Sequence, residues 1–122
     1  MHIDELTKII IGCAYNVSNT LGAGFLEKVY ENALVIELRN QGVQAEQQLP
    51  FKITYKGFVV GEYVADLVVG NLVLVEIKVA RALDKAHMAQ CINYLTAAQL
   101  NLALLMNFAK SKVEIQRVVR GL

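Results

Sequence analysis

Apolar residues recur at every third or fourth position in three stretches of the chain, a pattern that predicts three amphipathic helices. The stretches cover residues 3–20, 25–41 and 84–100. The glycines of LGAG, residues 21–24, suit the break between the first two helices, because glycine adopts the left-handed conformation that ends many helices. Asp84 is a suitable N-cap for the third helix.

Strand-like segments fill most of the remaining chain and predict one sheet. They cover residues 43–55, 58–69, 73–79, 102–108 and 113–119. Short turns join the first three in an antiparallel meander, with Pro50 indicating an edge strand or a bulge. The order ααβββαββ predicts an α/β (α+β) fold, a central mixed sheet of about five strands flanked by helices.

Size and composition favour a single compact domain over residues 1–122. Hydrophobic residues make up 55% of the chain and charged residues 19%, so disorder is not expected. Cys13 and Cys91 lie on apolar helical faces without metal-ligand spacing, which predicts reduced core thiols in a cytoplasmic protein. The apolar runs are too short to cross a bilayer, and we expect no membrane association.

The third strand candidate carries two charges that a buried strand does not need. Side chains alternate between the two faces of a strand, so Val73, Val75 and Ile77 form an apolar face while Glu76 and Lys78 lie opposite. Asp66 holds the corresponding position on the preceding strand. The apolar faces of the two strands coincide only if a three-residue loop, 70–72, joins them.

In that register Asp66 and Glu76 are cross-strand neighbours, with Cβ atoms roughly 5 Å apart. Two carboxylates this close favour a divalent cation with oxygen preference, Mg²⁺ or Mn²⁺, and Lys78 adds a positive charge beside them. Such a group suits phosphodiester hydrolysis. The alternative is an amphipathic strand whose charged side faces solvent.

A set of short motifs resembles a known family. GFLEKVY, residues 24–30, matches the signature G-x-x-E-x-x-Y of the small bacterial GxxExxY proteins. Further matches run through nearly the whole chain: YKG at 55–57, ADLVV at 65–69, VEIK at 75–78, AQCINYL at 89–95, NF at 107–108 and Arg117. The chain is thus similar to the GxxExxY family, which is placed in the PD-(D/E)XK nuclease-like superfamily.

The resemblance implies a restriction-endonuclease-like core and a metal-dependent nuclease. It implies Asp66 and Glu76 as metal ligands, joined by Glu27 from a helix and by the main-chain carbonyl of Ile77. It implies Lys78 as the catalytic lysine. As a lone feature, Glu27 is also explained as a first-turn acid favoured by the helix dipole.

Gln90 and Tyr94 resemble the Q-x-x-x-Y feature that many superfamily exonucleases place beside the site. Their spacing of four puts them on one helix face, apart from the stripe of Cys91 and Leu95. The alternative is a surface glutamine and a tyrosine whose ring is buried and whose hydroxyl reaches solvent.

The expected partner is nucleic acid, DNA before RNA, through a local patch, because a net charge of +1 gives no broad attraction to polyanions. Two groups of basic residues are candidates for this patch: Lys78, Arg81 and Lys85, and Lys110, Lys112, Arg117 and Arg120. A catalytically silent binding or assembly module, such as a homodimer, is the alternative to a nuclease.

Overall fold

The computed structural model describes residues 1–121, so Leu122, the last residue of the predicted domain, lies outside it. Its elements follow the predicted order ααβββαββ, and each predicted end lies within two residues of the observed one. They are α1 (Ile3–Leu21), α2 (Glu27–Asn40), β1 (Ala45–Tyr55), β2 (Phe58–Val69), β3 (Val73–Lys78), α3 (Lys85–Ala98), β4 (Leu102–Asn107) and β5 (Glu114–Val119). Among the described residues, no helix is long and apolar enough to span a membrane.

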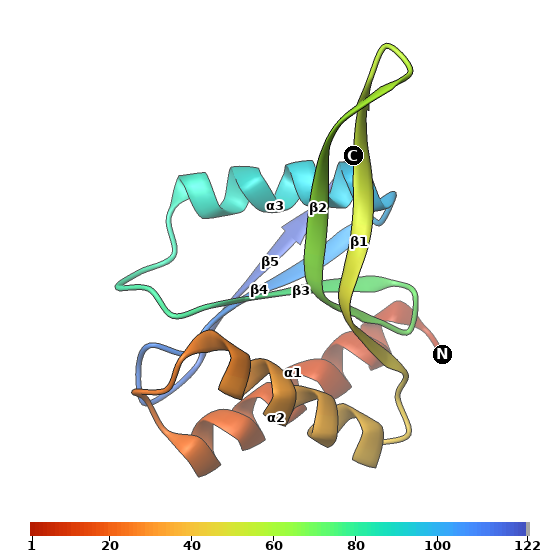
Figure 1. Cartoon of the computed structure of the whole chain (residues 1–122). Helices are drawn as coiled ribbons and strands as arrows, with labels where there is room; N and C mark the ends of the chain where they lie inside the picture. The colour runs from red at the N-terminus through yellow and green to blue at the C-terminus, as the bar shows by residue number, and fades with distance from the viewer. Residues whose placement is uncertain (122) are drawn as a thin grey trace.

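The strands form one mixed sheet in the order β1-β2-β3-β4-β5. Neighbouring strands are antiparallel except β3 and β4, which are parallel because α3 connects them across the sheet. Helices α1 and α2 cover one face and α3 covers the other (Figure 1). This arrangement confirms the predicted fold, and β1 is an edge strand, as Pro50 indicated.

Each face of the sheet carries its own core. The core under α1 and α2 contains the predicted apolar face of β3, Val73, Val75 and Ile77, together with Cys13. The smaller core under α3 includes Cys91. Both cysteines are buried free thiols, as predicted.

The two faces of the β1–β2 hairpin exchange sides where the hairpin leaves the body of the sheet. Leu67 belongs to the core under α1 and α2, whereas Ala65, two residues earlier, belongs to the core under α3. Regular alternation would place both on one face. Gln48, level with Asp66 in the pairing of β1 with β2, has a φ of +53°, a left-handed conformation that bends the hairpin at this point.

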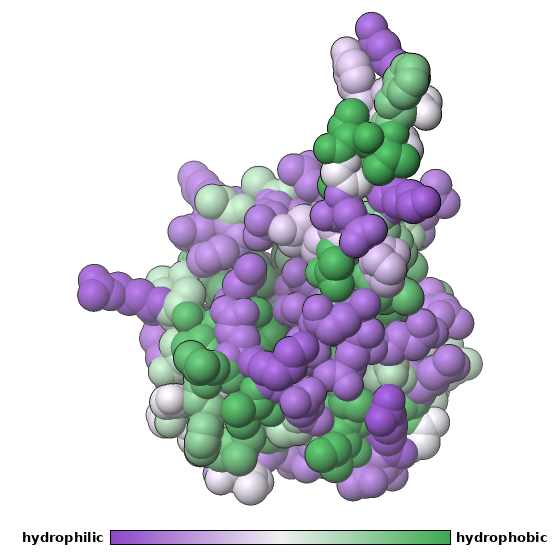
Figure 2. All heavy atoms as spheres, in the orientation of Figure 1, coloured by the Kyte–Doolittle hydropathy of each residue, from purple (hydrophilic) through white to green (hydrophobic). Residues whose placement is uncertain are grey.

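Beyond this bend the hairpin projects from the molecule as an arm (Figure 1). Near its tip, Tyr55, Phe58, Val59 and Val60 are each more than half exposed. Figure 2 shows apolar residues on the projecting hairpin, above a body surface on which polar and apolar areas are mixed in this view.

Tyr30 ties the turn between α1 and α2 to the core. Its fully buried side chain stacks on Phe108, with ring centroids 4.7 Å apart. Its hydroxyl donates to the Gly22 carbonyl at 2.7 Å and accepts from the Phe25 amide at 3.2 Å. The tyrosine of the G-x-x-E-x-x-Y segment thus holds the start of α2 in place, as expected for a core tyrosine with a bonded hydroxyl.

We expect Tyr30→Phe to lower the free energy of unfolding by about 1–3 kcal/mol, because the substitution leaves two backbone groups without their partner. Urea denaturation measures the change. Tyr55→Phe, at an exposed arm position, is the control and should alter stability little. Equal stability of the Tyr30→Phe and wild-type proteins would show that the hydroxyl contributes nothing to the turn.

Candidate active site

The predicted register between β2 and β3 is confirmed. Leu67 pairs with Val75 and Val69 pairs with Val73, which leaves residues 70–72 as the loop. Gly70 and Asn71 in this loop have the positive φ values, 58° and 57°, that a tight turn of this kind requires. Continued by one residue, the same register brings Asp66 level with Glu76.

At Asp66, side chains replace the backbone ladder between the two strands. The Asp66 amide donates to Glu76 Oε2 at 3.0 Å, and the Ile77 amide donates to Asp66 Oδ2 at 2.8 Å. The ladder itself ends at the pair Leu67 and Val75, since the bend carries β2 away from β3 beyond that point. The two carboxylates therefore occupy the place where the sheet opens.

Burial dominates the electrostatics of this pair. Glu76 is only 4% exposed, which argues against the alternative of a solvated strand face. Burial, followed by the charge of Asp66, raises the pKa of Glu76 to about 7, while the Asp66 amide, Tyr63 and Lys78 lower it. Burial also raises the pKa of Asp66, and the bond from Ile77 opposes this shift. Because Glu76 is the more deeply buried, we assign the pair's last proton to it.

Glu27, the first residue of α2, reaches the end of β3. Its Oε1 accepts a hydrogen bond from the Val79 amide at 3.3 Å, although the residue is otherwise exposed. Its negative charge is one of the causes that raise the pKa of Asp66. Glu27 therefore lies near the pair, as the resemblance implied, but it is bonded to backbone.

No three His, Cys, Asp or Glu side chains within residues 1–121 are close enough together to hold a metal ion. The chemistry of the nearby donors nevertheless fits Mg²⁺ or Mn²⁺, since Asp66 and Glu76 offer carboxylate oxygens beside further negative charge. The Ile77 carbonyl adds a candidate donor. It points to the same side of β3 as the Ile77 amide, toward Asp66, where β2 offers no ladder partner.

Lys78 is the positively charged residue beside the carboxylate pair. It is half-buried at the end of β3, and its charge lowers the pKa of both Asp66 and Glu76. An ammonium group at this position stabilises negative charge that enters the opening between β2 and β3.

Tyr94 and Gln90, the pair implied on α3, differ in their surroundings. The Tyr94 ring stacks on Tyr63 of β2, with centroids 3.5 Å apart, and burial followed by the charge of Glu76 raises the pKa of Tyr94. It is therefore packed beside the carboxylates. Gln90 is exposed and forms no side-chain hydrogen bond with the described residues, so the structure leaves it available to a ligand or to solvent.

Three residues around the site were not predicted as site residues. Glu31 is 4% exposed, accepts bonds from Gln47 and Gln48, and contributes to the raised pKa of Asp66. Its signal in the sequence is an acid within an otherwise apolar helical stripe. Tyr63 had no such signal, because regular alternation places it on the face of Leu67 rather than beside Glu76.

Asn107 is the third of these residues, and it holds the segment that follows β3. Its side chain donates to the Ala80 carbonyl at 2.8 Å and accepts from the Ala80 amide at 3.1 Å. It is 1% exposed, so these bonds are shielded from water. The motif NF at 107–108 therefore anchors the chain just beyond Lys78.

Three of the four basic residues of the C-terminal group have contacts with other surface side chains. Lys110 pairs with Glu114 at 4.0 Å, Lys112 lies over the Tyr15 ring, and Arg120 donates to Asn101. Exposed pairs of this kind contribute little to stability. Their convergence with Lys78 on one nucleic-acid surface stays a prediction.

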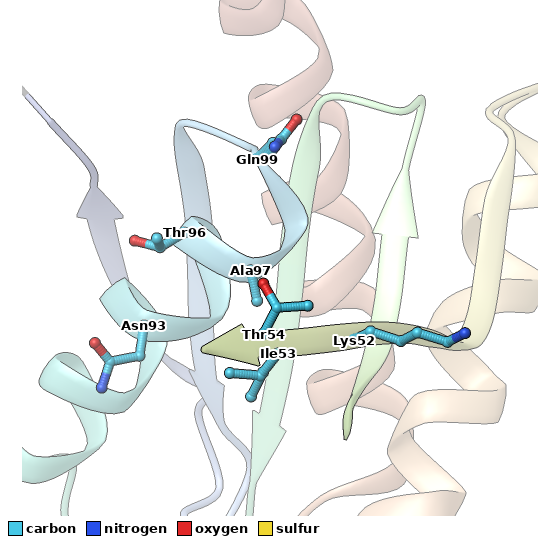
Figure 3. Close-up of a pocket in the computed structure, with 7 residues that line it drawn as sticks. All are labelled: Lys52, Ile53, Thr54, Asn93, Thr96, Ala97 and Gln99. Carbon is cyan, nitrogen blue, oxygen red and sulfur yellow. The ribbon is translucent and has the colours of Figure 1, made fainter. Parts of the chain in front are cut away.

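A groove of about 490 Å³ lies between the arm and α3 (Figure 3). Apart from Ile53 its lining residues are polar or small, and none is an acid: Lys52, Ile53, Thr54, Asn93, Thr96, Ala97 and Gln99. None of the predicted site residues lines it, so the opening at Asp66 and Glu76 remains the candidate active site.

Comparisons with known proteins agree with this fold. The structure titled "Crystal structure of SSO0001" is similar with a TM-score of 0.56 and 21% identity, over 98% of this chain and 59% of that chain. The chain thus spans about three fifths of that protein, and the likeness concerns the fold. No curated protein matches the chain significantly. The sequence model of the PD-(D/E)XK nuclease superfamily matches residues 4–118, and the chain therefore belongs to the PD-(D/E)XK nuclease superfamily.

Proposed function

We propose that this protein hydrolyses phosphodiester bonds in nucleic acid with the help of Mg²⁺ or Mn²⁺, with DNA as the first substrate to test. The observation that carries the proposal is the close pair of carboxylates at the opening of the sheet, with Lys78 beside them. Buried Glu76 accepts from the Asp66 amide, and half-buried Asp66 accepts from the Ile77 amide. Two like charges in a buried site are unfavourable without a cation. We further infer that the chain is a GxxExxY protein that acts in the cytoplasm.

The residues take the following roles in this proposal. Asp66, Glu76 and the Ile77 carbonyl would hold the metal ion. Glu27, whose carboxylate accepts from the Val79 amide, would add a further oxygen ligand. Once bound, the ion supplies a Lewis acid for the phosphoryl group and lowers the pKa of the attacking water.

Side chains on both sides of the metal ligands complete the proposed machinery. Lys78 stabilises negative charge that develops on the phosphoryl oxygens. Tyr94 and Gln90, one turn apart on α3, bind the phosphate or the attacking water. Arg81 and Lys85, which follow β3, contact the phosphate backbone.

Mn²⁺ should raise the melting temperature of the wild-type protein, because a ligand that binds only the folded state stabilises it. We expect a rise equivalent to about 2.7 kcal/mol at a concentration 100 times the dissociation constant. Asp66→Asn should lose most of this rise, and Asp4→Asn, an exposed carboxylate on α1, should keep it. Thermal unfolding with and without Mn²⁺ makes the comparison, and equal rises in both variants would exclude Asp66 as a ligand.

Turnover is tested separately, by incubating labelled single- and double-stranded DNA and RNA with Mn²⁺. The proposal predicts cleavage by the wild type that stops on chelation and is absent from Asp66→Asn. Absence of cleavage from all four substrates, or undiminished cleavage by Asp66→Asn, would reject the nuclease.

The projecting arm favours a second candidate function, that of an assembly module. Tyr55, Phe58, Val59 and Val60 expose apolar surface on a segment that makes few other contacts, and such surface is typical of interaction sites. A homodimer formed through the arm predicts a dimer in sedimentation that Phe58→Ser converts to monomer. A monomeric wild type would remove this candidate.

A further inference from the structure

Within residues 1–121, the Tyr63 hydroxyl is a buried polar group without a hydrogen-bond partner. The residue is 5% exposed, and its ring stacks on two other aromatic rings, Phe51 at a centroid distance of 6.1 Å and Tyr94 at 3.5 Å. Both stacks are close to parallel, with interplanar angles of 18° and 9°. The ring is therefore fixed, and the direction of its hydroxyl with it.

The Tyr63 hydroxyl is buried and makes no hydrogen bond within residues 1–121. An unsatisfied buried donor costs about 1–3 kcal/mol, and phenylalanine would fill the same space without that cost. The hydroxyl therefore does not stabilise the metal-free protein, whereas a contact with a bound ligand would explain why the residue is a tyrosine.

The Glu76 carboxylate is the acceptor best suited to the Tyr63 hydroxyl. The Tyr63 hydroxyl and Glu76 influence each other's pKa as donor and acceptor, although they are not in regular hydrogen-bond geometry. Glu76 Oε2 already accepts from the Asp66 amide, and an ionised carboxylate has about four acceptor sites, so capacity for a second donor remains. Burial, followed by the charge of Glu76, raises the pKa of Tyr63, which keeps the phenol protonated and able to donate.

We propose that Tyr63 is a positioning residue whose hydroxyl donates to the Glu76 carboxylate when that carboxylate binds a divalent cation. The bond adds a second donor to that of the Asp66 amide and leaves the remaining lone pairs of the carboxylate to the ion. Partners of this kind orient metal-binding carboxylates and strengthen metal affinity. The inference rests on the metal site of the proposed function and does not depend on the substrate.

Tyr63→Phe tests the inference because it removes one oxygen and keeps a ring that stacks on Phe51 and Tyr94. We expect Mn²⁺ affinity to fall about 10–100-fold, measured by calorimetric titration, while the melting temperature without metal stays equal or rises. Tyr55→Phe, an exposed tyrosine on the same hairpin, is the matched control and should leave Mn²⁺ affinity unchanged.

Other outcomes overturn the inference. Equal Mn²⁺ affinity in Tyr63→Phe and wild type would show that the hydroxyl does not orient Glu76, and a lower melting temperature without metal would show a structural hydroxyl. A wild type that binds no Mn²⁺ would remove both the inference and the metal site. A wild type that binds Mn²⁺ without cleaving nucleic acid, while Tyr63→Phe binds weakly, would reject only the nuclease.

Discussion

Glu76→Gln should make the metal-free protein more stable than the wild type at pH 8, by about 3 kcal/mol. The pKa of Glu76 rises from 4.5 to about 7 on folding, and each pKa unit corresponds to about 1.4 kcal/mol. The folded state then binds more protons than the unfolded state between these two values. Stability is therefore highest below pH 4.5 and falls as the pH rises to about 7.

A neutral glutamine avoids this penalty, since its amide oxygen can still accept from the Asp66 amide. Urea denaturation at several pH values makes the measurement. The two proteins should converge near pH 4.5 and diverge above it. Glu62→Gln, an exposed carboxylate on the neighbouring strand β2, is the control and should follow the wild type at every pH.

Addition of Mn²⁺ at pH 8 to about 1,000 times its dissociation constant should reverse this order, because the ion then stabilises the ionised wild-type site by about 4.1 kcal/mol and does not stabilise the glutamine variant. A wild-type stability that stays flat from pH 5 to 8 would mean that Glu76 titrates normally. The two carboxylates would then lack the mutual repulsion on which the proposed metal site depends.

Lys78→Ala should reduce the rate of phosphodiester cleavage by about 10²–10³-fold, equivalent to about 2.7–4 kcal/mol of transition-state stabilisation. The half-buried ammonium group acts on Asp66 and Glu76 in a poorly solvated opening, where a charge is screened less than on the surface. We expect the loss in kcat rather than in KM, because the charge that Lys78 stabilises develops in the transition state.

Mn²⁺ binding separates this role from that of the metal ligands. Lys78→Ala should still bind Mn²⁺, whereas Asp66→Asn should not, although both lose activity. Lys8→Ala, an exposed lysine on α1, controls for the loss of a positive charge and should retain the wild-type rate. A Lys78→Ala protein with the wild-type rate would exclude this lysine from catalysis.

The register of β2 and β3 was predictable because a slip of one residue would expose an entire apolar face. That constraint placed Asp66 beside Glu76 and determined the loop at 70–72, and both agree with the structure. The motif residues Glu27 and Tyr94 also lie near the pair, although periodicity alone left each with an ordinary structural explanation.

The surroundings of the pair were less predictable. Tyr63 lies beside Glu76 because the hairpin turns over at Gln48 and Asp66, which breaks the alternation that a sequence pattern assumes. Glu31 is buried, and its carboxylate accepts bonds from Gln47 and Gln48, which are distant from it in the sequence. The projection of the arm follows from the same bend and likewise has no signature in hydropathy.

The sequence by itself determined the order of the elements, the two faces of β3 and the meeting of Asp66 with Glu76, since local periodicity and apolar burial specify all three. Only the tertiary structure decided how deeply Glu76 is buried, that Tyr63 and Tyr94 lie near it and that its pKa rises to about 7. Burial and electrostatic environment depend on contacts between residues far apart in the chain, and the bend in β2 creates those contacts here.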